Sequence, residues 1–225
     1  MPVIFFFGPD GSGKSTISKS VATILTKYGL KVKISWMRGS HTLASILARC
    51  LHRIDGFRGS DNPYYKIRIP PKLRRLWQTI EFVSVLPILL VKFILPNLLG
   101  YVVVAERYLP DYIVWISLTT RDMTYENSIV AKFFKALANR AMIRIYMTAS
   151  LEELYKRRPI IDSLPIEHQL TLYEDLAVEL GALKLDTTKK TTSQSLEIAF
   201  KVISRKMGLP LKQGSNIGID SIINS

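Results

Sequence analysis

The sequence predicts an α/β fold, with a doubly wound parallel sheet of about five strands and helices on both faces. The first reason is that residues 3–7 form a short, wholly apolar run, which is typical of a buried parallel strand. The second is that residues 16–25 repeat apolar side chains at the spacing of one helix face. The third is the glycine-rich stretch between them, because strand, glycine loop and helix in this order begin many sheets of this class.

The glycine-rich stretch reads G-x-x-x-x-G-K-S from Gly8 to Ser15, the pattern of a loop that cradles phosphates. Its glycines permit backbone conformations forbidden to other residues, so loop N–H groups can converge on an anion at the positive end of the next helix. In this pattern Lys14 reaches the β- and γ-phosphates, and the Ser15 hydroxyl ligates Mg²⁺. The alternative is a plain glycine turn before an ordinary helix. The predicted ATP-binding residues are Gly8, Asp10, Gly11, Ser12, Gly13, Lys14, Ser15 and Thr16.

The later elements follow from periodicity and turn residues. Gly29 is placed to end the first helix, and the Pro96-Asn97 pair with Gly100 predicts a turn after a long apolar helix. In chain order we expect a strand at 31–36, a helix at 42–53, a loop at 54–72, a helix at 72–95, a strand at 101–105, helix broken near 119–122 over 111–138, a strand at 141–147, helices from Ser150 and over 166–180, a strand at 183–185 and a helix at 192–207.

A carboxylate follows the strand at 101–105. Because ligands sit at the carboxyl ends of parallel strands, Glu106 is well placed to hold Mg²⁺ directly or through water. Arg107 beside it can bind a phosphate with two parallel hydrogen bonds. The alternative is a surface ion pair at a strand end. Ser15 and Glu106 are therefore the predicted metal ligands.

Composition limits the class of protein. Of 225 residues 48% are hydrophobic, which excludes a disordered chain, and the single Cys50 excludes a disulfide framework. No histidine or cysteine has a partner at metal-ligand spacing, and no nucleophile-elbow motif supports a serine hydrolase. Because the first strand begins at Val3, we expect no signal peptide and a cytoplasmic location. The net charge of +13 suits polyanionic partners, namely nucleotides, nucleic acid or an anionic membrane surface.

Two stretches leave alternatives open. Residues 82–104 are long and apolar enough to cross a bilayer, but Pro87, Lys92 and the turn residues interrupt them, so a buried helix is preferred. The segment from Arg38 to Arg75 is rich in lysine and arginine, with aromatic residues among them. It is either a phosphate or nucleic-acid contact surface or a solvated face with no specific role.

The second half of the chain contains a basic helix end, Arg157-Arg158, before a proline-bounded segment. A helix, a basic loop and a second helix are what a closing lid over transferring phosphates would look like, and a solvated helix end is the alternative. We place one kinase domain at residues 1–208, its lid at about 157–166, and a polar tail at 209–225.

The motifs together resemble those of the thymidylate kinase family of P-loop nucleoside monophosphate kinases, over most of residues 1–206. Glu106-Arg107-Tyr108 is similar to the family's Asp-Arg-Tyr motif, in which the acid lies near Mg²⁺ and the arginine holds the acceptor phosphate. The loop acid Asp10 matches one that contacts the acceptor sugar. The resemblance implies acceptor binding by Asp10, Arg38, Arg107 and Tyr108, and catalytic roles for Lys14, Arg107, Arg157 and Arg158. Residues 173–177 and 184–186 are similar to stretches that come later in the sequences of that family.

The chain also departs from the family pattern. Ser12 stands where some members carry a catalytic arginine, so the lid arginines would supply that charge. The Arg-Glu-Pro-Gly stretch is Arg38-Gly39-Ser40-His41 here, and residues 78–85 contain no arginine of the kind that reads the base. The motif acid is glutamate rather than aspartate.

The sequence therefore predicts an ATP- and Mg²⁺-dependent phosphotransferase that acts on a small phosphorylated acceptor, with the nucleotide dTMP favoured. Two rivals remain. One is a kinase of the same fold that acts on a lipid or polyprenyl alcohol, a sugar or an RNA end. The other is a non-catalytic module that uses ATP as a switch. The apolar helix can also serve as a homodimer contact.

Overall fold

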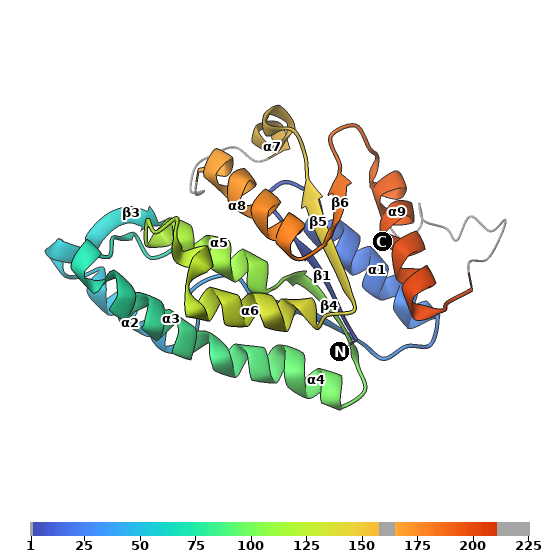
Figure 1. Cartoon of the computed structure of the whole chain (residues 1–225), viewed down its shortest axis with the longest axis horizontal. Coiled ribbons are helices and arrows are strands. Elements are labelled where there is room, and N and C mark those ends of the chain that lie inside the picture. The colour runs from blue at the N-terminus through green and yellow to red at the C-terminus, as the bar shows by residue number, and fades with distance from the viewer. Residues whose placement is uncertain (1, 158–164, 211–225) are drawn as a thin grey trace.

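The computed structural model describes residues 2–157 and 165–210 (Figure 1). In that part of the chain the central feature is a five-stranded sheet in the order β2-β4-β1-β5-β6, in which every pairing is parallel. This confirms the predicted α/β class and the strand number. The strands are β1 (Val3–Phe7), β2 (Val32–Trp36), β4 (Val102–Arg107), β5 (Ile143–Thr148) and β6 (Leu183–Asp186).

The side chains of β1 are all buried and alternate between two cores. Val3, Phe5 and Phe7 face the larger core, beneath α5 (Leu109–Thr119), α6 (Ile129–Asn139) and α8 (Ile166–Glu179). Ile4 and Phe6 face the other core, which α1 (Lys14–Lys27) and α9 (Thr192–Met207) cover. Figure 1 shows these two helix layers on opposite sides of the sheet.

The loops after β1 and β4 leave the sheet toward opposite faces. The β1 loop leads into α1, while the β4 loop leads into α5. Strands β1 and β4 are neighbours, with Val3 paired to Val103 and Phe5 to Ala105. A crevice therefore opens beyond their carboxyl ends, which is where open parallel sheets bind ligands.

The long apolar helix differs from its prediction. It runs as α3 (Arg74–Leu89), a π-helical segment (Leu90–Ile94) and α4 (Leu95–Leu98). The predicted turn is confirmed at Gly100, whose φ is 81°, but is wrong at Pro96-Asn97, which lie within α4. The prediction of a buried helix is also wrong, because one side of the helix is exposed. Pro96 has no N–H to give to the Lys92 carbonyl four residues earlier. The Ser35 hydroxyl of β2 donates to that carbonyl instead, at 2.7 Å. This neighbouring donor explains how helical structure continues through a proline.

The other elements lie close to their predicted places. α2 spans Thr42–Leu51, the predicted break before α6 holds a 3₁₀ turn (Tyr125–Asn127), and α7 spans Leu151–Arg157. The predicted loop at 54–72 contains a short strand that the sequence did not reveal, β3 (Arg58–Asn62), which bridges to Ile67 outside the main sheet. Arg158, most of the predicted lid and residues 211–225 of the predicted tail lie outside the described residues.

Candidate functional site

The glycine-rich loop has the backbone conformation that its glycines were predicted to permit. Gly8, Gly11 and Gly13 have φ values of 138°, 86° and 89°, a region that residues with a Cβ rarely adopt. At Gly8 a Cβ would also lie 2.0 Å from the Met147 carbonyl oxygen. Helix α1 begins directly after Gly13, so the loop and the positive end of the helix lie at one place.

Lys14 is buried against its own loop. Its Nζ donates to the Pro9 carbonyl and to the Ser12 Oγ, at 3.2 Å for the latter. Burial, and after it the nearby Arg107 guanidinium, lower the pKa of Lys14 from 10.5 to about 7. The loop carbonyl thus holds a lysine whose charge is weakly solvated, which an anion would stabilise.

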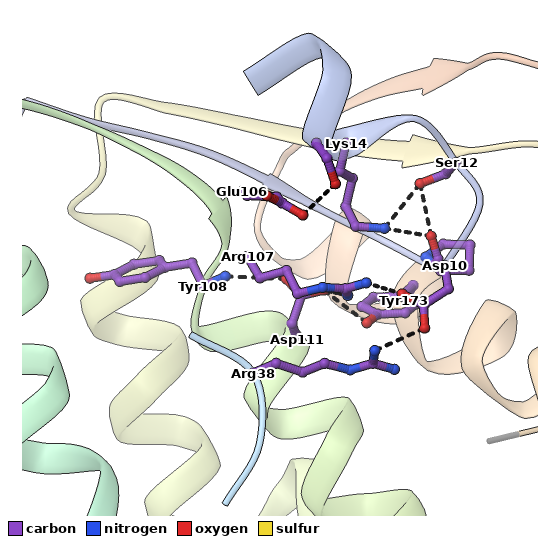
Figure 2. A network of polar contacts seen from close by, with 11 residues as sticks. Asp10, Ser12, Lys14, Arg38, Glu106, Arg107, Tyr108, Asp111 and Tyr173 are labelled. Carbon is purple, nitrogen blue, oxygen red and sulfur yellow. Dashed lines mark hydrogen bonds and ion pairs between the residues drawn. The ribbon is translucent and has the colours of Figure 1, made fainter. Parts of the chain in front are cut away.

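Ser15 and Glu106, the two predicted metal ligands, are in contact. The Ser15 hydroxyl donates to a Glu106 carboxylate oxygen, although the residues are 91 positions apart in the chain. The pairing of β1 with β4 brings them together, because Glu106 is the second-last residue of β4 and Ser15 lies in the first turn of α1, into which the loop after β1 leads. Figure 2 shows the Glu106 side chain beside Lys14.

A hydroxyl and a carboxylate are the hard oxygen ligands that Mg²⁺ prefers. The described residues contain no cluster of three or more His, Cys, Asp or Glu side chains that could hold a metal by protein ligands alone. This fits Mg²⁺, which usually takes one or two protein oxygens and completes its shell with phosphate and water. The residues present therefore fit the predicted ion.

Asp10 lies at the centre of a buried ion cluster (Figure 2). One of its oxygens accepts from Arg38 at 2.8 Å, and the other accepts from Arg107. All three side chains are nearly inaccessible to solvent. The loops after β1 and β2 supply Asp10 and Arg38, and Arg107 is the last residue of β4, so the cluster joins the carboxyl ends of three strands.

Further hydrogen bonds hold Arg107 in place. Its Nη1 donates to Asp111 at 2.8 Å. Asp111 also accepts from the Tyr173 hydroxyl at 2.9 Å and from the Tyr108 N–H at 3.2 Å. Burial raises the pKa of Asp111, and the Arg107 charge opposes that rise. Sequence reasoning gave Asp111 no role. Its position three residues after Tyr108, at the start of a helix, is a capping pattern that could have revealed it.

Tyr108 was predicted to bind the acceptor, but its side chain does not lie with the other predicted acceptor residues, Asp10, Arg38 and Arg107. Its ring is buried in the main core, 5.2 Å from the Phe5 ring and 4.8 Å from the Phe93 ring. Figure 2 shows the ring directed away from the ion cluster. The predicted acceptor contact by this side chain is thus corrected: the residue contributes its backbone N–H to Asp111 and its ring to packing.

Arg157 lies against the outer side of the glycine-rich loop. Its guanidinium donates to the Thr187 hydroxyl at 2.9 Å and carbonyl at 3.0 Å, and to the Gly11 carbonyl at 3.4 Å. Glu153 accepts from its Nε at 2.9 Å. The predicted lid arginine is therefore at the loop, and Thr187 is a partner that the sequence did not suggest.

An aromatic stack borders the crevice on the Arg38 side. The Arg38 guanidinium lies 5.3 Å from the Trp115 ring centre, and Tyr64 stacks on Trp115 at 5.0 Å. The crevice has a volume of about 460 Å³. It is lined by the glycine-rich loop together with Trp36, Arg38, Tyr64, Glu106, Arg107 and Arg157.

The comparisons with known proteins add no family. The sequence matches no protein-family model, and no curated protein matches it either. The fold itself shows an α/β protein with an all-parallel sheet.

Proposed function

We propose that this chain is an ATP- and Mg²⁺-dependent phosphotransferase that resembles thymidylate kinase and acts on a phosphorylated acceptor, with nucleoside monophosphates, dTMP first, as the favoured class. The observation that carries the proposal is the contact of Ser15 with Glu106 beside Lys14. It unites the end of a glycine-rich loop with the acid of the neighbouring strand, and phosphoryl transfer needs both.

On the donor side, the loop N–H groups and Lys14 hold the ATP phosphates. Ser15 and Glu106 would hold Mg²⁺, which neutralises phosphate charge when bound. Arg157, already at the loop, lies where it can offset charge that develops on the transferred group. Arg158 is proposed for the same role from the sequence alone.

On the acceptor side, Arg38 and Arg107 form a pair of guanidinium groups that a phosphate can bridge. Asp111 and Tyr173 hold Arg107 in orientation from behind. Asp10 lies between the two arginines and would turn toward an acceptor hydroxyl. Phosphoryl transfer depends on positioning and charge more than on covalent chemistry, so these residues suffice without a nucleophile.

The direct test is Lys14→Ala, with Lys19→Ala as the matched control because Lys19 is exposed on the same helix. We expect Lys14→Ala to lower turnover at least about a hundredfold, because it removes a cation at the transferred phosphate, and Lys19→Ala to leave turnover unchanged. ATP turnover with an acceptor is measured, and urea unfolding checks the fold. Near-normal turnover in Lys14→Ala would refute the assignment.

One observation keeps other acceptors in consideration. In the segment where the family reads its base, the polar side chains are already engaged: Gln78 donates to Asp122 at 2.9 Å, Ser84 accepts from the Ala44 N–H at 2.9 Å, and Glu81 accepts from Ser40. A site whose polar groups do not hydrogen-bond to a base discriminates poorly between that base and its analogues. A same-fold kinase with a lipid, sugar or RNA acceptor is therefore the second candidate.

An acceptor panel with labelled ATP separates the candidates. Strong turnover of dTMP alone supports the first proposal, and turnover of another acceptor supports the second. ATP binding with only slow, acceptor-independent hydrolysis would indicate a nucleotide switch instead. We propose the cytoplasm as the compartment, since ATP is the donor and Cys50 is a free, exposed thiol.

A further inference from the structure

The helical stretch α3–α4 is apolar on its exposed side as well as on the side that faces the core. Between residues 82 and 99 every side chain that is exposed is apolar. We call this set the apolar strip: Val83, Leu86, Pro87, Leu90, Val91, Leu95, Leu98 and Leu99. The polar Glu81 and Ser84 are buried on the inner side, where they bond to Ser40 and to the Ala44 N–H. A surface helix normally carries polar side chains on its exposed side, so the apolar strip predicts a partner.

The surroundings of the apolar strip are basic. Lys72 and Arg75 are exposed at the start of the same helical stretch, before the strip begins at Val83. Lys33 lies on the same face of the edge strand β2 as Ser35, which contacts the helix, and Lys92 is half-buried beside it. The helices α2, α3, α4 and α6 together contain one acidic residue, the buried Glu81. An apolar surface with the cations Lys72, Arg75, Lys33 and Lys92 near it complements an anionic surface.

A second copy of the chain fits this surface poorly. In an antiparallel two-fold pair, Lys72 and Arg75 of one copy would lie over residues 95–99 of the other, and a parallel pair would bring like charges together. Neither arrangement offers these cations an acid from the helices involved. An anionic bilayer offers headgroup charges and an apolar interior together.

The strip cannot leave the fold to cross a bilayer. The stretch Pro71–Leu98 is the one helix of the described residues that is long and apolar enough to span a membrane. Its inner side, however, carries Val85, Leu89 and Phe93 into the main core, and Ser35 ties Lys92 to β2. Figure 1 shows α3 and α4 along one rim of the molecule. The helix can therefore only lie in the plane of the membrane, as interfacial helices do.

We propose that the apolar strip and its bordering cations dock this protein on the surface of an anionic phospholipid bilayer, with α3–α4 parallel to the membrane plane. The inference does not depend on the proposed kinase activity. Residues in the crevice take no part in it.

Vesicle flotation tests the proposal with the full chain. Wild type is expected to float with vesicles of phosphatidylcholine and phosphatidylglycerol, and weakly or not at all with phosphatidylcholine alone. Lys72→Ala with Arg75→Ala should weaken binding roughly 30-fold, since each cation near an anionic surface contributes about fivefold. Leu90→Gln with Leu98→Gln should weaken it at least about tenfold, because both leucines would otherwise leave water.

Val178→Gln is the matched control, since Val178 is 81% exposed on α8, away from the strip. It should bind vesicles as wild type does, and urea unfolding should show that all variants fold. The proposal is overturned if wild type does not float with anionic vesicles, or if the control variant loses binding as much as the strip variant. Light scattering of lipid-free protein adds a second arm: a stable dimer that the strip variant dissociates, without flotation, would assign the strip to a second copy.

Discussion

At the residue scale, Gly39 shows how one missing side chain shapes the crevice beside Arg38. A Cβ on Gly39 would lie 2.8 Å from the Trp115 ring. The Arg38 guanidinium and the Tyr64 ring both pack against Trp115. The ring can lie this close to the backbone only because residue 39 is glycine.

We expect Gly39→Ala to displace Trp115, to destabilise the protein by about 1–3 kcal/mol, and to weaken acceptor binding more than ATP binding. Gly56→Ala is the control, because no described atom lies within 4 Å of a Cβ there, and it should be neutral or slightly stabilising. Urea unfolding and separate KM values for the two substrates measure the effects. An unchanged acceptor KM in a destabilised Gly39→Ala protein would limit Trp115 to packing.

Lys14 gives a second residue-scale prediction. Its pKa of about 7 in the free protein leaves it mostly neutral at about pH 8, while bound phosphate would keep it charged. Nucleotide binding should then take up a proton, and affinity should fall as pH rises above about 7. Calorimetry in buffers of different ionisation enthalpy measures the uptake, and Lys14→Met should abolish it. Equal heats in all buffers would contradict a lysine close to the phosphates.

At the element scale, α3 carries a buried acid that weakens the fold at neutral pH. Burial raises the pKa of Glu81 from 4.5 to about 7, and one of its oxygens has no hydrogen-bond partner among the described residues. The folded protein therefore binds a proton between these pH values that the unfolded chain does not. Stability from this group is present below about pH 4.5 and is lost as pH rises toward 7.

Glu81→Gln should remove that loss, since the amide keeps an oxygen for the Ser40 hydroxyl without a charge. We expect the free energy of unfolding to rise by about 2 kcal/mol at about pH 8 and to change little at about pH 5. Urea unfolding at both pH values provides the measurement. A loss of stability at both would show that Glu81 is charged and needed in that form.

At the scale of the whole molecule, the cluster around Arg107 joins three strand ends to α5 and α8. Asp111 is fully buried, with Arg107 and Tyr173 as partners. Asp111→Asn leaves Arg107 buried with less compensation, so it should cost about 3 kcal/mol, while Tyr173→Phe should cost about 1 kcal/mol. Asp55→Asn, which removes an exposed partner of Arg58, should cost less than about 0.5 kcal/mol. Equal, small losses in all three would mean that the cluster adds nothing to global stability.

The fold was predictable where one local signal dominated. The apolar run of β1 and the glycines after it determine the sheet centre and the loop, and strand adjacency then brings Glu106 to Ser15. Two kinds of feature were not predictable. Continuation of the helix past Pro96 depends on Ser35, a donor 57 positions from Lys92 in the chain. The inward direction of Tyr108 depends on Phe93, and no local pattern contains such distant partners.

The position of Asp10 between Arg38 and Arg107 has a consequence for how the proposed kinase would cycle. Two buried guanidinium groups without an anion would repel each other and be poorly solvated. The Asp10 carboxylate pairs with both arginines, and in the proposed kinase it would keep them aligned between turnovers. An incoming acceptor phosphate would then compete with this carboxylate for the two arginines, and the carboxylate would help to displace the product afterwards. Modest acceptor affinity would then accompany rapid release.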